Sequence, residues 1–283
     1  MGLFSGLDKF GLGEYEGMDL LNTNKQEAQL NNMSPESQKT PEEREQEAIY
    51  DKHYECSVCG ANFINKCVKA GKVKLVGKDT DLRPIYDYMD PIKYDVVVCD
   101  KCGYAALTRY YGKLSTRQMK DVYEQIGSRF SGIRMYDNLY SYEDAIMRYK
   151  FALITSVVKK AKKGEIAYTS LKLAWVLRGY RLSLPKTSDK IKSLYDDELE
   201  SIKNAYEGFV SAISNEPFPI AGMDESTLKY IMADLARKLK KFDESAKLLG
   251  DVIVSKGTNS RLKEEALNLK DLLKEDIKMN SNE

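Results

Sequence analysis

Two cysteine pairs limit the possible folds of this chain more than any other feature. Cys56 and Cys59 form the first pair, Cys99 and Cys102 form the second, and a glycine directly follows each pair. That glycine lets the backbone turn tightly, so that amide N–H groups can point at thiolate sulfurs. Two such turns supply four soft ligands in a tetrahedron, which is typical of zinc. We therefore predict one metal site made by all four thiols.

The identity of the metal is less constrained than the ligands. Tyr54, two residues before Cys56, makes the first turn similar to that of rubredoxin, which holds iron. Residues 50–112 carry 10 Lys and Arg against 8 Asp and Glu, so they lack the acidic composition of such electron carriers. We expect zinc, with iron as the alternative. Four thiolates leave no open coordination position, so the ion would stabilise the fold rather than catalyse a reaction.

Other reactive residues are few. His53 is the only histidine, and the four thiols already complete a ligand shell without it. Cys67 is the fifth cysteine, and we interpret it as a small buried apolar residue, with a reactive thiol as the alternative. The sequence contains no nucleotide-binding loop, hydrolase serine motif or zinc protease motif. We therefore expect a protein that is not an enzyme.

Charge and hydropathy exclude several classes of protein. The 283 residues carry a net charge of +1, which gives no strong field toward nucleic acid or an acidic membrane. No stretch approaches the roughly 18 apolar residues that a membrane-spanning helix needs. The start of the chain lacks the basic and apolar regions of a secretory signal. Cysteines in CxxC pairs then indicate metal binding in a reducing cytoplasm rather than disulfides.

The composition divides the chain into three regions. Residues 1–48 look like a flexible acidic tail with a short apolar cluster, since residues 1–49 hold 4 Lys and Arg against 10 Asp and Glu. Residues 49–113 hold both CxxC pairs and many β-branched and aromatic residues, which predicts a small zinc-ribbon-like β domain. Within it, 93–99 is the clearest strand, and 63–76 should contain one or two more. Residues 114–283 have a helical period.

The third region should form a series of long helices separated by short breaks. Ser115 or Thr116 can cap the first, which would run to about residue 126. Prolines and glycines mark the breaks near residues 185 and 217–222. The other expected helices span 143–162, 165–180, 189–213, 225–239, 242–255 and 260–278.

Three of these helices share one spacing. A small residue is followed four positions later by a large one, and three positions after that by a small or aliphatic one. The instances are Ala145, Tyr149 and Ala152; Ala205, Phe209 and Ala212; and Ser245, Leu249 and Val252. This spacing resembles the second helix of a tetratricopeptide repeat, although the intervals depart from the regular 34 residues. We predict a degenerate tetratricopeptide-like array; the alternative is an ordinary helical bundle. The fold class is thus α+β and mostly α.

Four further features have both a functional and a structural interpretation. Asp79, Asp81 and Arg83 can hold a cation or substrate, but a turn with a local ion pair is commoner. Ten of the 19 tyrosines lie between Tyr86 and Tyr142, and we expect them to cover the seam between ribbon and helices rather than to stack on bases. The basic run at 159–163 should be solvated, and Trp175 should lie in the core.

Longer motifs carry a family resemblance. They include the CxxCG pairs, the segment from Val68 to Lys74, Asp79-x-Asp81-Leu-Arg83-Pro-Ile-Tyr86, Asp90-Pro-Ile-Lys-Tyr94 and the Phe4–Gly13 segment. In this order they resemble the bacterial family catalogued as domain of unknown function 2225. The resemblance implies a zinc-ribbon-like start and tetratricopeptide-like helices, and it implies no activity. Where many members have proline after the first cysteine of each pair, this chain has Ser57 and Asp100.

These observations together favour a cytoplasmic zinc-binding adaptor. We expect the ribbon to act as a rigid cap and the helices to offer a groove for a protein or peptide partner, without membrane insertion. One alternative is a nucleic-acid-associated protein that uses an aromatic and basic ribbon face. The second alternative is a redox protein, with iron in the cysteine turns or with a reactive Cys67.

Overall fold

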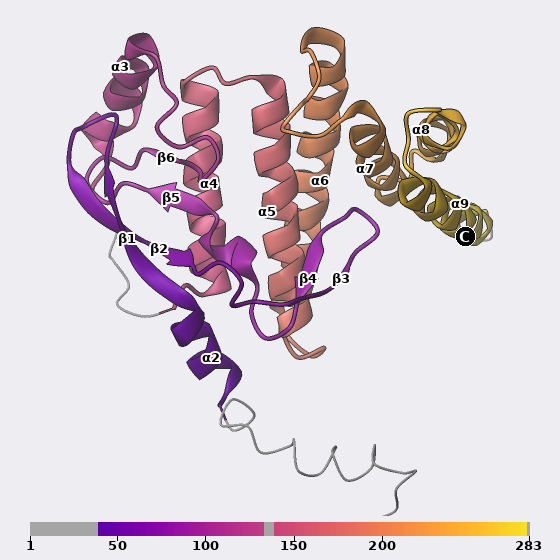
Figure 1. Ribbon diagram of the computed structural model, residues 1–283, viewed down its shortest axis with the longest axis horizontal. Coiled ribbons are helices and arrows are strands. Elements are labelled where there is room, and N and C mark those ends of the chain that lie inside the picture. The colour runs from indigo at the N-terminus through magenta and orange to yellow at the C-terminus, as the bar shows by residue number, and fades with distance from the viewer. Residues whose placement is uncertain (1–38, 133–138, 282–283) are drawn as a thin grey trace, which may run out of the picture. The chain divides into compact units, whose positions relative to one another are not determined.

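The computed structural model describes residues 39–132 and 139–281 (Figure 1). The chain divides into two units, 1–44 and 45–283. Our predictions for residues 1–38, including the apolar cluster, lie outside the described residues. The last eight residues that we assigned to the tail form helix α2, Pro41–Ala48.

The β region consists of three antiparallel strand pairs. Strands β1 (Ile49–Glu55) and β2 (Asn62–Val68) form the longest hairpin, with Ile49 opposite Val68. Strands β3 (Leu75–Lys78) and β4 (Pro84–Tyr86) form the second. Strands β5 (Val96–Val98) and β6 (Ala105–Leu107) form the third, which is buried along its whole length.

The strand predicted at 93–99 is shorter than expected. Residues Pro91–Tyr94 form a 3₁₀ turn, η5, before β5 begins. Asp90 caps this turn by accepting a hydrogen bond from the Ile92 backbone N–H at 3.3 Å, and Pro91 supplies the fixed φ of a first helical position. The local capping interaction therefore keeps Lys93 and Tyr94 in the turn, and the strand is limited to the three valines.

The remaining region is helical, as predicted, so the molecule is mostly α with a small β part. Ser115 caps α3 and Gln118 completes the capping box. From α4 onward, short connections join consecutive helices, and each described helix packs against the next in sequence (Figure 1). The bounds are α3 Thr116–Gln125, η6 Gly127–Arg129, α4 Tyr142–Val158, α5 Lys163–Ser183, α6 Lys190–Asn215, α7 Glu225–Lys238, α8 Phe242–Val254 and α9 Ser260–Asn280.

The small–large–small positions identified from the sequence all face the interior. The nine residues in α4, α6 and α8 are each at most 1% exposed. The turns also recur: Lys160 after α4 and Lys240 after α7 both adopt positive φ. In each turn the next N–H bonds a carbonyl five residues back, Ala161 to Ser156 and Lys241 to Ala236, both at 2.9 Å. That this helical array resembles tetratricopeptide repeats stays a prediction.

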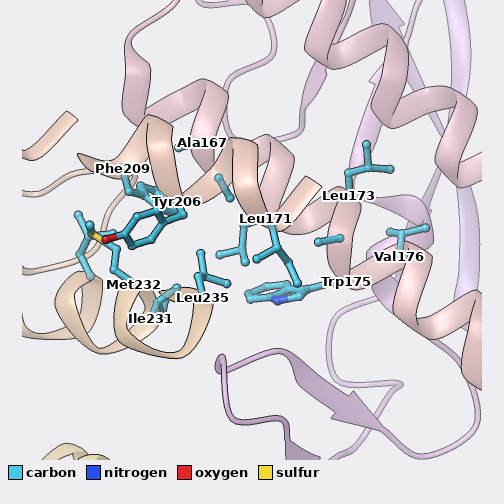
Figure 2. Packing of buried hydrophobic residues seen from close by; sticks show 14 of the residues in the cluster. Ala167, Leu171, Leu173, Trp175, Val176, Tyr206, Phe209, Ile231, Met232 and Leu235 are labelled. Atoms are coloured by element: carbon cyan, nitrogen blue, oxygen red, sulfur yellow. The ribbon is translucent and has the colours of Figure 1, made fainter. Parts of the chain in front are cut away.

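One hydrophobic core joins the helices to the third strand pair. Val96, Val98 and Leu107 belong to the same buried cluster as the residues of α4 and α5. Figure 2 shows another part of this cluster, where Phe209 of α6 and Leu235 of α7 lie near Leu171 of α5. The two regions that we separated at residue 113 therefore share a core.

Candidate metal centre

Each CxxC pair forms the turn of a β-hairpin. The first pair lies between β1 and β2, and the second lies between β5 and β6. The two turns have the same backbone hydrogen bonds. The N–H of the first cysteine bonds a carbonyl five residues later, Cys56 to Ala61 and Cys99 to Tyr104, both at 2.9 Å. Two equivalent turns on two hairpins are the arrangement expected of a zinc ribbon.

The glycine after each pair adopts a left-handed conformation, which agrees with the tight turn that we expected there. Gly60 has a φ of 72° and Gly103 a φ of 70°. The amide of each glycine bonds the carbonyl of the first cysteine, at 2.8 and 3.0 Å. The Val58 N–H also points at the Cys56 sulfur, at 3.4 Å. These contacts orient the thiols before any ion is bound.

The four sulfurs converge on one point. All four lie within 4.8 Å of one another, with Cys56 and Cys102 3.5 Å apart and Cys59 and Cys99 3.7 Å apart. A zinc ion with four sulfurs at about 2.3 Å gives a tetrahedron with edges of about 3.8 Å. A disulfide would need about 2.05 Å, and all five cysteines are free thiols. The donor set therefore fits a tetrahedral thiophilic ion.

The thiols also influence one another electrostatically. Hydrogen bonding from Cys102 and Cys99 lowers the pKa of the Cys56 thiol, and the contact with Cys56 raises the pKa of Cys102. Crowded thiols cannot all ionise without a cation between them. A bound dication would let all four exist as thiolates.

Aromatic residues enclose the centre. Tyr104 is fully buried, and its ring packs against Tyr111 with centroids 4.9 Å apart. The Tyr111 hydroxyl is buried and has no hydrogen-bond partner among the described residues. Burial, and next the charge of Cys56, raise the pKa of this hydroxyl. A metal-bound Cys56 thiolate would be an acceptor for this buried hydroxyl.

The second turn is also covered from the helical side. Phe130, just after η6, lies so close to Gly103 that a Cβ there would be 2.6 Å from the ring. The Phe130 ring meets Phe151 of α4 edge-on, with centroids 5.6 Å apart. This chain of contacts fixes the second turn against α4.

The other sulfur and nitrogen ligands of the sequence lie outside the centre. His53 is exposed on β1, opposite Ile64. Cys67 is half-buried on β2, with its sulfur 3.6 Å from the Tyr54 hydroxyl rather than enclosed in apolar core. Neither residue belongs to the four-sulfur cluster.

A second cluster of charges is larger than the local ion pair that the sequence suggested. Asp81 is fully buried and accepts from both terminal nitrogens of Arg178, at 3.0 and 2.6 Å. Lys238 lies 2.7 Å from Asp81 and 2.7 Å from Asp234, which is also fully buried. We call this set the Asp81 network. Its members are Asp79, Asp81, Arg83, Asp90, Arg178, Glu198, Asp234 and Lys238.

The Asp81 network holds the loop between β3 and β4 against helices α5, α6 and α7. It also borders a cleft of about 690 Å³, whose wall includes Arg178, Arg237 and Lys240. Arg181 and Arg237 pair with Glu198 and Asp234, so five cations face the five carboxylates and little uncompensated charge is left for a ligand. Its evident effect is to fix the loop to the helices.

Two sequence interpretations need correction or extension here. Lys159, which we expected to be solvated, is buried and paired with Glu165 at 2.6 Å. Arg178 and Lys238 were missed as partners of Asp81, and Glu198 and Asp234 were missed as the carboxylates that share those two cations. The available signal was Arg178 itself, a cation within the most apolar stretch of α5.

Comparison with known proteins agrees with the motifs. A family model described as "Uncharacterized protein conserved in bacteria (DUF2225)" matches residues 49–273. The chain belongs to this family. No curated protein and no solved structure is significantly similar to this DUF2225 member. Within the described part of the chain, none of the helices is long and apolar enough to cross a membrane.

Proposed function

We propose that this DUF2225 member is a non-enzymatic, cytoplasmic zinc-binding adaptor whose helical region docks a protein partner. The observation that carries the metal part is the convergence of Cys56, Cys59, Cys99 and Cys102 within 4.8 Å. Four thiolates around one ion leave no open position for substrate or water. The ion therefore contributes to folding, and reduced thiols of this kind suit the cytoplasm.

The adaptor part is supported by how the molecule is built. Strands β5 and β6, which flank the second cysteine turn, share one core with the helices, so we expect bound metal to stiffen the surface that the helices present. Successive helices packed in chain order form extended surfaces that bind peptides in other helical arrays. Neither the described cysteines nor the lone histidine forms a second cluster suited to catalysis.

Metal content and partner capture test the two parts separately. Purified full-length protein should contain one zinc per chain and be colourless, and Cys99→Ser should lose the zinc. Visible absorbance from bound iron would contradict the zinc-binding adaptor and favour the redox alternative. When the wild-type protein is crosslinked in cells, a defined partner protein should be recovered with it. The Cys99→Ser variant should recover less of that partner. Retention on heparin that fades with salt, without such a partner, would favour the nucleic-acid alternative.

A further inference from the structure

The lining of an aromatic groove includes none of the four cysteines of the metal centre and no member of the Asp81 network. It has a volume of about 530 Å³ and is bordered by β1, β4, η5 and α5. Six of its lining residues are aromatic: Tyr50, Tyr54, Tyr86, Tyr94, Tyr168 and Trp175. Pro84 and Pro91 add further rigid apolar surface. A concave site of this size and composition is suited to a ligand.

Trp175 gives this groove an unpaired polar group. The side chain is 5% exposed, and its indole nitrogen is buried without a hydrogen-bond partner among the described residues. Figure 2 shows the nitrogen on the edge of the ring that faces away from Leu171. Buried indole N–H groups usually find an acceptor, so the missing acceptor points to a ligand or a water.

Most polar groups of the groove can donate a hydrogen bond. The Trp175 N–H and the Lys52 ammonium donate only, and the hydroxyls of Tyr50 and Tyr168 can donate or accept. Among the described residues that line the groove, Asp95 supplies the one carboxylate, and it is paired with Lys172. A matching ligand should therefore offer acceptors and few donors.

We propose that this groove binds a proline-rich segment of a partner protein in the polyproline II conformation. This inference deepens the proposed adaptor function and rests on it. Each proline offers a carbonyl acceptor and no N–H, which matches the donors of the groove. Proline rings pack on aromatic faces, and the extended helix is formed before binding.

Charge argues against single-stranded nucleic acid as the occupant. Lys52, Lys172 and Asp95 give the groove a net charge of only +1. Proteins that bind single strands combine stacked aromatics with a continuous basic track for phosphates. Lys52 instead lies over the Tyr54 ring, 5.0 Å from its centroid.

Trp175 is the single tryptophan of the chain, so its fluorescence reports on the groove directly. Titration of full-length protein with decaproline should give a saturable change in Trp175 emission, and a decamer of glycine and serine should give none. Tyr50→Ala should weaken decaproline binding about tenfold or more. The matched control is Tyr123→Ala on α3, which removes a similarly exposed ring (51% against 42%) and should leave binding unchanged.

Trp175→Phe keeps an aromatic ring but removes the donor, so it should weaken binding of a fluorescein-labelled decaproline, measured by anisotropy. Absence of saturable decaproline binding, or equal weakening by Tyr50→Ala and Tyr123→Ala, would overturn the inference. Binding of decathymidylate in place of decaproline would also overturn it. If cells still yield a crosslinked partner, the adaptor proposal stands and only the ligand class is wrong; without a partner both fail.

Discussion

The sulfurs of Cys59 and Cys99 lie 3.7 Å apart, although the two residues are 40 positions apart in sequence. Strands β1 and β2 present one of them, and β5 and β6 present the other. The residues between the two turns include the β3–β4 hairpin and η5. The loop of this hairpin is bonded to α5 and α7 through Asp81, and η5 packs on α4 and α5. An ion bound by both turns would close the chain segment between them into a loop and so link the ribbon to the helical core. Four predictions concern this linkage and the packing around it.

Gly103→Ala should damage the metal centre more than Gly60→Ala. Both residues have a positive φ, so either alanine should cost about 1–2 kcal/mol of folding free energy. A Cβ at Gly103 would also meet the Phe130 ring at 2.6 Å, whereas nothing lies within 4 Å at Gly60. That clash should add about 1–3 kcal/mol. Zinc retention against a chelator and thermal unfolding should rank the variants; equal effects would exclude the Phe130 contact as a cause.

Asp81→Asn should strongly destabilise the protein. The substitution leaves Arg178 and Lys238 facing a neutral group in a fully buried position. Breaking one side of a buried ion pair costs about 3–5 kcal/mol. Asp79→Asn is the matched control, because the Asp79 side chain is 25% exposed and water can replace part of its interaction. Urea unfolding measures both, and a smaller loss for Asp81→Asn than for Asp79→Asn would contradict the account.

The contribution of Asp81 should depend on pH in a defined direction. Burial alone would raise the pKa of Asp81, but the charges of Lys238 and Arg178 lower it below its ordinary value. A carboxylate with a lowered folded-state pKa stabilises the fold above its unfolded-state pKa of about 3.9. That stability is lost as the pH falls from about 4 through the folded-state pKa.

The difference in unfolding free energy between wild type and Asp81→Asn should therefore be largest above about pH 5 and shrink below about pH 4. Urea unfolding at several pH values measures it. A difference that stays constant down to the lowest pH at which the protein folds would show that Asp81 acts through packing rather than charge.

Gly208→Ala should destabilise the crossing of α5 and α6 in spite of the better helix propensity of alanine. The new Cβ would lie 2.8 Å from the Cβ of Ala167. Overpacking of this kind costs about 1–3 kcal/mol. Gly250→Ala on α8 meets nothing within 4 Å and should stabilise by about 0.5–1 kcal/mol. Thermal unfolding should show a loss of stability for Gly208→Ala and a gain for Gly250→Ala. Stabilisation by both would mean that α5 and α6 can move apart enough to accommodate the new Cβ.

Local sequence signals predicted much of this structure. The first expected helix begins at Thr116 with Ser115 as its cap, one of the two caps that we expected, and the family and the mostly α fold class are confirmed. The four thiols could be grouped because each CxxC turn is encoded within a few residues. The Asp81 network could not be predicted, because Arg178 and Lys238 are 97 and 157 positions away from Asp81. Such contacts arise from helix packing, which no local pattern specifies.

X-ray absorption at the zinc edge on purified full-length protein tests the central claim most directly. The account predicts one zinc per chain with four sulfur neighbours at about 2.3 Å and no nitrogen or oxygen neighbour. Fewer than four sulfurs around the zinc, or a protein that folds with no stoichiometric metal, would contradict a single centre shared by Cys56, Cys59, Cys99 and Cys102.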